Sequence, residues 1–163
     1  MYISSDTNIW FDFSAVGHLD YPFRLPHAYC ISQNAFQDEI LEADLQDQLV
    51  AKGLQLTQMT NEEYQQAIDY ANAYPKLSTY DALALAIAKQ RDWTLLTGDG
   101  ALRKAAEKEH IPCRGTIWVY DQLKETGGLT EEEYYVVIEA LIEAVSRGER
   151  RLPMVELNKR KRP

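Results

Sequence analysis

The amino-acid sequence predicts an α/β fold with a mostly parallel sheet. Short apolar segments, typical of buried strands, alternate along the chain with longer segments of helical periodicity. Three helical segments begin with a capping box, in which Thr60, Ser78 or Thr130 precedes an acidic residue by three positions. The 163 residues, 45% hydrophobic and 26% charged, suffice for one globular domain and exclude a disordered or collagen-like chain.

The N-terminal part of the chain predicts two strands separated by a helix and a loop. Residues 2–5 form the first expected strand, and residues 6–8 the turn that follows it. The apolar residues from Ile9 onward open a helix. Residues 17–26 contain two prolines, which interrupt regular structure, so a loop leads to the second strand over residues 28–31.

A long helix and a third strand are expected next. Ser32 can cap a helix over residues 33–49, in which Phe36 and Ile40 have helical spacing. Residues 53–57 alternate between apolar and polar side chains, as in a half-buried strand.

The middle of the chain contains the most apolar helix of the sequence. The capping box at residue 60 opens a helix that reaches Tyr74 and is ended by Pro75. The next capping box precedes residues 82–88, which are apolar almost all round, so this helix is expected to be buried against the sheet. Residues 93–97 then form a nearly continuous apolar strand, as parallel sheets favour.

The C-terminal part of the chain predicts three helices and the last strand. Residues 101–109 form a helix, residues 112–114 the last strand and residues 116–123 a further helix. The third capping box opens a helix over residues 131–146 with an apolar face.

Charge is distributed unevenly along the chain. Residues 147–163 contain seven of the 17 Lys and Arg against two acids and carry +5, so the remaining 146 residues carry −13. An acidic body repels polyanions unless cations offset its carboxylates. A nucleic-acid ligand therefore requires bound metal, the basic tail or both; residues 159–162, the basic tip, are interpreted as a solvated, disordered tail, with phosphate binding as the alternative.

The sequence contains no signal for export or membrane insertion. No segment approaches the roughly 18 consecutive apolar residues of a membrane span, and the N-terminus lacks the basic and apolar regions of a signal peptide. The only cysteines, Cys30 and Cys113, do not suggest a disulfide framework or a zinc site. We therefore expect a cytoplasmic protein that does not bind membranes.

Four acidic residues are candidates for a metal site. Asp6 and Asp99 each follow an expected strand, Asp81 lies in the first turn of the buried helix, and Glu39 lies midway along the helix expected over residues 33–49. Each alone could be a helix cap, a turn residue or a solvated carboxylate. If they gather at the C-terminal edge of the sheet, Mg²⁺ or Mn²⁺ would neutralise them, and these ions catalyse phosphodiester hydrolysis.

Three segments resemble the acidic motifs of PIN-domain nucleases, including VapC-like toxin ribonucleases and their relatives. These segments are residues 5–8, 77–86 and 95–103, and their order and spacing also match over about residues 1–125. Residues 36–40 fit the glutamate motif, with Glu39 as the better candidate and the adjacent Asp38 as the alternative.

The resemblance implies a three-layer α/β/α fold with about five strands. Residues 1–126 would form the PIN-like nuclease domain. Residues 127–163 extend beyond the compact toxin pattern as a C-terminal helix and basic tail, which pack on the domain or extend it.

The resemblance also implies a metal-dependent endoribonuclease that hydrolyses single-stranded RNA, in the family often as the toxin of a toxin–antitoxin pair. Its acids would map onto Asp6, Glu39, Asp81 and Asp99 as catalytic residues and as ligands of Mg²⁺ or Mn²⁺. Thr97 would orient carboxylates or water, and Asn8 would support the same site. Arg103, four residues after Asp99, would contact substrate phosphate or form an ion pair with Asp99. The implied partners are single-stranded RNA, an antitoxin protein and a second copy of the chain.

Two alternative functions remain open at this point. A PIN-like fold with weak or no catalysis could serve as a protein-binding module. A metal-dependent phosphatase of the haloacid-dehalogenase type is disfavoured, because that family expects a second aspartate where this chain has Asn8.

Overall fold

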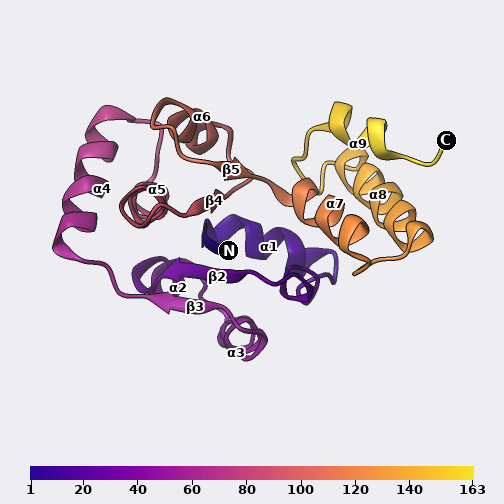
Figure 1. Cartoon of the computed structure of the whole chain (residues 1–163), viewed down its shortest axis with the longest axis horizontal. Helices are drawn as coiled ribbons and strands as arrows, with labels where there is room; N and C mark the ends of the chain where they lie inside the picture. The colour runs from indigo at the N-terminus through magenta and orange to yellow at the C-terminus, as the bar shows by residue number, and fades with distance from the viewer.

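Five parallel strands form one sheet, with the order β3-β2-β1-β4-β5, in the computed structural model, which describes residues 1–163 (Figure 1). The strands are β1 (Tyr2–Ser5), β2 (Ala28–Ser32), β3 (Gln55–Thr57), β4 (Thr94–Leu96) and β5 (Cys113–Arg114). Ile3 in the central strand pairs with Tyr29 on one side and Thr94 on the other. The sheet and its flanking helices confirm the predicted α/β class and the three-layer arrangement.

The strand order reverses direction between β1 and β4. The chain proceeds from β1 to β2 and β3 toward one edge, and then returns to place β4 on the other side of β1. In open parallel sheets such a reversal leaves a crevice outside the C-terminal ends of the two strands, where ligands bind. The residues that follow Ser5 and Leu96 therefore occupy the favoured position for a site.

One face of the sheet is covered by the larger of two hydrophobic clusters. Ile3, Tyr29 and Leu96 face this cluster, since alternate residues of a strand point to the same side. Its helices are α1 (Thr7–Ala15), α2 (Gln33–Glu39), α3 (Ala43–Lys52), α7 (Thr116–Thr126), α8 (Glu131–Ser146) and α9 (Met154–Arg160).

The other face is covered by α4 (Asn61–Ala73), α5 (Thr79–Arg91) and α6 (Gly100–Lys108). Residues 82–88 of α5 are all buried, which confirms the expectation for this helix. Ser4 in β1 donates to the Ala84 carbonyl across 2.8 Å, so α5 lies directly on the central strand. All three capping boxes are present, at Thr60, Ser78 and Thr130.

The helix expected over residues 33–49 is in fact two helices. α2 ends at Glu39 and α3 begins at Ala43, with the fully buried Ile40 at the C-cap of α2 in a non-helical conformation. The Gln46 side chain donates to the Ile40 carbonyl, which the break leaves without a helical partner. Phe36 and Ile40, which have helical spacing, are both buried as expected. Because the chain changes direction after Ile40, Leu49 of α3 is also buried in the core.

Three smaller boundaries differ from the expectations. α1 begins at Thr7 in place of the turn expected over residues 6–8, with Asp6 at its N-cap. The expected loop contains a short 3₁₀ helix, η1 (Pro22–Arg24). β3 begins two residues late because Gly53, with φ of 119°, ends α3 in the left-handed conformation.

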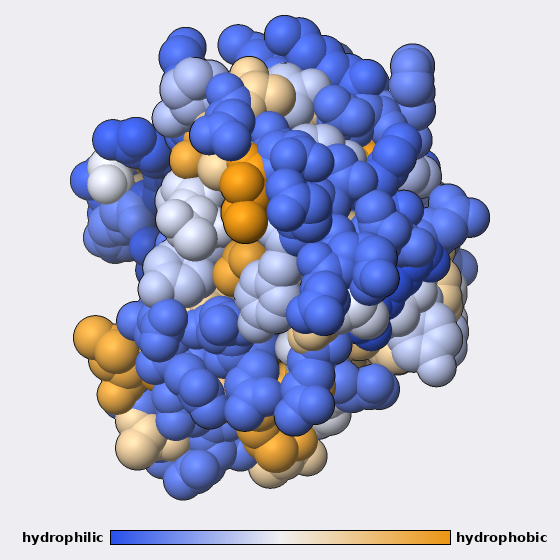
Figure 2. All heavy atoms as spheres, turned by 90° about the vertical axis from the view of Figure 1, so that its left-hand side faces the viewer, coloured by the Kyte–Doolittle hydropathy of each residue, from blue (hydrophilic) through white to orange (hydrophobic).

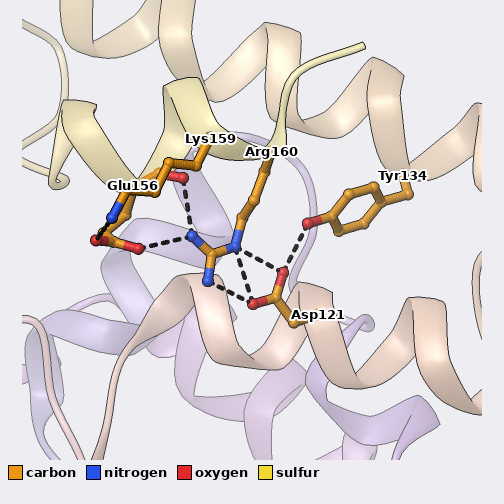
Figure 3. A network of polar contacts seen from close by, with 5 residues as sticks. All are labelled: Asp121, Tyr134, Glu156, Lys159 and Arg160. Atoms are coloured by element: carbon orange, nitrogen blue, oxygen red, sulfur yellow. Dashed lines mark hydrogen bonds and ion pairs between the residues drawn. The ribbon is translucent and has the colours of Figure 1, made fainter. Parts of the chain in front are cut away.

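The C-terminal helices α8 and α9 lie together at one end of the molecule, beside α7 (Figure 1). Arg160 forms an ion pair with Asp121 of α7 at 2.9 Å, and Tyr134 of α8 donates to the same carboxylate at 2.6 Å (Figure 3). Arg162 pairs with Glu132 of α8. The interpretation of residues 159–162 as a disordered tail was therefore wrong, because α7 and α8 supply carboxylates that hold two of its arginines.

Hydrophilic atoms dominate the surface on the α4 side of the molecule, where a narrow strip of apolar and neutral atoms runs between them (Figure 2).

A cavity of about 370 Å³ lies between α2, α4 and α5. No helix of the chain combines the length and apolar character needed to cross a membrane.

Candidate active site

Asp6 lies directly after the central strand, at the point where the strand order reverses. Its backbone N–H donates to the Leu96 carbonyl at 3.0 Å, which continues the pairing of β1 with β4. Its side chain is 5% exposed and makes no capping hydrogen bond to α1. Instead, Oδ2 accepts a hydrogen bond of 2.8 Å from the Thr97 hydroxyl.

Thr97 connects Asp6 with Asp99. The fully buried Thr97 hydroxyl donates to Asp6 and accepts from the backbone N–H of Asp99 at 3.0 Å. Asp99 in turn caps α6, because its Oδ1 accepts from the Leu102 N–H at 2.8 Å. One hydroxyl thus holds together two acidic positions that are far apart in the sequence.

Asp81 is both a capping residue and a neighbour of the other two acids. Its Oδ2 accepts from the Ser78 backbone N–H at 3.0 Å, and Ser78 Oγ accepts from the Asp81 N–H at 3.1 Å. These capping hydrogen bonds, like the one made by Asp99, engage a single oxygen of the carboxylate. The capping role therefore leaves the second oxygen of each side chain for another ligand.

The three aspartates form a negatively charged group without a cationic partner. Burial raises the pKa of Asp6 to about 6; the charges of Asp81 and Asp99 act in the same direction, while the Thr97 hydroxyl and the Asn8 backbone N–H act against it. Burial also raises the pKa of Asp81, with a contribution from the Asp99 charge. None of the three takes part in an ion pair.

Glu39 lies at the C-terminal end of α2 rather than midway along a helix. Its Oε1 accepts a hydrogen bond of 2.7 Å from Thr7, the residue after Asp6, so it borders the acidic group. Asp38 instead accepts from Tyr80 at 2.7 Å and lines the cavity between α2, α4 and α5. The geometry therefore favours Glu39 over Asp38 as the fourth acid.

The donor set is suited to a hard divalent cation. It consists of carboxylate and hydroxyl oxygens, the ligands that Mg²⁺ and Mn²⁺ prefer, with no histidine or cysteine among them. The structure contains no three acidic, histidine or cysteine side chains placed closely enough to hold a metal ion. The chemistry of the residues thus fits such an ion, whereas the side chains are not closed into a finished coordination site.

Neither the Asn8 nor the Arg103 side chain makes a hydrogen bond to the three aspartates. The Asn8 side chain is exposed, and only its backbone N–H acts on Asp6. Arg103 forms no ion pair with Asp99; its guanidinium donates to the Thr97 carbonyl at 3.4 Å and lies against Gly115. A Cβ atom at Gly115 would lie 2.8 Å from Arg103 Nη2, so the glycine makes room for the arginine.

Asp12 is a further acid that the sequence reasoning missed. It lies on α1, half-buried, and its Oδ2 is 3.8 Å from the position that a Cβ at Gly98 would occupy, next to Asp99. Burial raises the pKa of Asp12, and the charge of Arg150 opposes this effect. The available signal was a single charged residue within the apolar run Ile9–Phe13.

Comparison with known families identifies the fold family of the chain. A family model described as a PIN domain matches residues 2–156. The chain therefore belongs to the PIN-domain family, and its fold is of the nuclease type, since PIN domains are generally nucleases. No curated protein and no solved structure matches the chain.

Proposed function

We propose that this PIN domain is an endoribonuclease that hydrolyses phosphodiester bonds in single-stranded RNA and requires Mg²⁺ or Mn²⁺. The observation that carries the proposal is the connection of Asp6 to Asp99 through Thr97 at the reversal of strand order, with Asp81 close enough to raise the pKa of Asp6. Asp6 is buried and the other acids are partly exposed, and the group has no cationic partner. The resulting cost in free energy would be removed by a bound cation.

All four acids would serve as ligands of the cation. Asp6, Asp81 and Asp99 would contribute carboxylate oxygens, and Glu39, which accepts a hydrogen bond from Thr7, would add a fourth carboxylate. Thr97 keeps the Asp6 carboxylate in one orientation. When bound, such a cation lowers the pKa of water and stabilises the charge that develops on phosphate and leaving oxygens.

A cleavage assay tests the proposal directly. The purified chain is incubated with a 5′-labelled single-stranded RNA in Mn²⁺, in Mg²⁺ and in EDTA. We expect internal cleavage with either ion and none in EDTA. Asp99→Asn should reduce the rate at least 100-fold without unfolding the protein, because asparagine caps a helix as well as aspartate does.

Asp47→Asn is the matched control, since Asp47 is an exposed acid of α3 outside the site. Cleavage by Asp99→Asn at the wild-type rate would reject the site. Absence of cleavage by a folded wild-type chain would instead favour the protein-binding module, and release of phosphate from a small monoester would favour the phosphatase.

The proposed toxin role, antitoxin partner and homodimer are tested separately. Growth of cells that express the chain alone is compared with growth when the product of the neighbouring gene is also expressed. Growth arrest that this product relieves would support a toxin–antitoxin pair. Sedimentation of the purified chain measures whether it pairs, for example through the exposed part of α8.

A further inference from the structure

A cavity of about 830 Å³ lies beside the acidic group. Gly98 and Gly100, which flank Asp99, form part of its wall, so the cavity begins where the candidate site ends. The remaining wall comes from Arg103 of α6, from β5 and α7, and from residues 145–160. It therefore depends on the C-terminal segment that follows α8.

Arginines dominate the charge of this cavity. Five line it, against two acids, Asp121 and Glu156, and both acids pair with the same residue, Arg160 (Figure 3). The other four form no ion pair with any carboxylate: Arg103, Arg114, Arg150 and Arg151. In a chain of net charge −8, this is a local surplus of positive charge.

Two of these arginines are held in place by backbone carbonyls and retain free donors. Arg103 donates to the Thr97 carbonyl at 3.4 Å, and Arg150 Nη1 to the Glu149 carbonyl at 2.7 Å. Arg150 Nε is buried without any hydrogen-bond partner. An unpartnered buried donor on a charged side chain is costly, and an anionic oxygen is the ligand that would satisfy it.

The cavity also has an apolar wall, so it can contact apolar or aromatic groups of a ligand as well as its anionic groups. Ile117, Leu152 and Trp118 line it, and His27 stacks on the Trp118 ring with centroids 5.6 Å apart. Arginines combined with aromatic and aliphatic surface are typical of sites for single-stranded nucleic acids, where phosphates and bases are both contacted.

We propose that this cavity binds the phosphodiester backbone of a single-stranded nucleic acid, so that the strand runs from the arginines across the acidic group. The inference rests on the proposed nuclease function. It assigns phosphate binding to all four unpaired arginines. Arg103 and Arg150 lie nearest the acids, and Arg114 and Arg151 lie further along the wall of the cavity. It also explains how an acidic protein holds a polyanion: the phosphates next to the scissile bond meet arginines rather than carboxylates.

The test measures binding without cleavage. Anisotropy of a fluorescein-labelled 12-mer of single-stranded RNA, and of the corresponding DNA, is titrated with the full chain in EDTA at several salt concentrations. For Arg114→Gln combined with Arg151→Gln we expect roughly tenfold weaker binding and a salt slope reduced by about 1.4, for two lost phosphate contacts.

The matched control is Arg147→Gln combined with Lys161→Gln, which removes the same charge at exposed positions outside the cavity. We expect this pair to retain wild-type affinity. Weaker binding of either the RNA or the DNA by the cavity variant supports the proposal. The oligonucleotide that the wild type binds more tightly shows whether the cavity prefers ribose or deoxyribose. Equal affinity of the cavity and control variants, or no binding by the wild type at 50 mM salt, would overturn it.

The two proposals fail separately. Loss of affinity in the cavity variants would establish the binding site even if the chain did not cleave RNA. Unchanged affinity in a chain that cleaves RNA would reject the cavity alone.

Discussion

Asp6 has an ionisable side chain that is almost completely buried next to two other carboxylates. The pKa of Asp6 is about 6 in the folded protein, against an ordinary value of 3.8. Between pH 3.8 and 6, Asp6 therefore keeps its proton in the folded protein and has lost it in the unfolded chain. The free energy of unfolding therefore falls as the pH rises from about 4 to 6, and remains lower above pH 6. The wild-type residue is thus expected to destabilise the metal-free fold at neutral pH.

Asp6→Asn should stabilise the metal-free protein while abolishing cleavage. Asparagine is neutral at every pH and can still accept the Thr97 hydrogen bond, so the expected gain is on the order of 2 kcal/mol at pH 7.5 and close to zero at pH 4. Urea denaturation in EDTA at both pH values measures it, with Asp47→Asn as the exposed control. A variant less stable than the wild type at pH 7.5 would contradict this account of Asp6.

At the scale of single residues, the sequence predicted which acids lie near one another better than it predicted their individual contacts. Asp6 and Asp99 became candidates because they follow expected strands, and the C-terminal ends of parallel strands meet at one edge, whereas Thr97 came from the resemblance to the PIN family. The sequence favoured Glu39 over Asp38, but the contacts that distinguish them, with Thr7 and with Tyr80 respectively, come only from the tertiary structure. Asp12 was missed because its proximity to Gly98 depends on how α1 packs across the sheet end.

At the scale of elements, α4 and α5 are joined by a buried ion pair as well as by apolar contacts. Glu63 is 2% exposed and pairs with Arg91 at 2.7 Å, while also closing the capping box with Thr60. Burial by itself would raise the pKa of Glu63, but the hydrogen bonds from Arg91 and Thr60 outweigh it and leave the pKa below its ordinary value of 4.5.

Glu63→Gln should destabilise the protein by about 1 to 3 kcal/mol at pH 7, because it removes the partner of Arg91 from a buried position. A lowered pKa stabilises the fold above pH 4.5, and this contribution is lost as the pH falls through the folded-state value. The difference between wild type and variant should therefore shrink at pH 3. Urea denaturation checks this, with Glu62→Gln, its exposed neighbour, as the control; equal losses in both variants would count against the ion pair.

Element boundaries were predictable where the side chain itself determines them. The three capping boxes set the starts of α4, α5 and α8 through local hydrogen bonds that the sequence contains in full. The break at Ile40 was not predictable, because the apolar spacing continues through it and only packing of α3 on the core shows that the helix must turn. The same break places Glu39 at a helix end, beside Thr7.

At the scale of the whole molecule, the two signs of charge are arranged side by side. Arg160 and Arg162 of the basic tip neutralise acids of α7, α8 and α9, and so stabilise the C-terminal end of the fold. Arg150 and Arg151, earlier in the same segment, remain unpaired beside the acidic group. The sequence located the surplus of positive charge correctly, but which arginines are free depends on the tertiary contacts.

The central claim is that Asp6, Asp81 and Asp99 together bind a divalent cation. Calorimetric titration of the full chain with Mn²⁺ at pH 7.5 tests it most directly. We expect saturable binding of one or two ions by the wild type and by Asp47→Asn, and a loss of at least tenfold in affinity in Asp99→Asn and Asp6→Asn. Wild-type affinity in both site variants would show that these carboxylates do not form the metal site and would contradict the account.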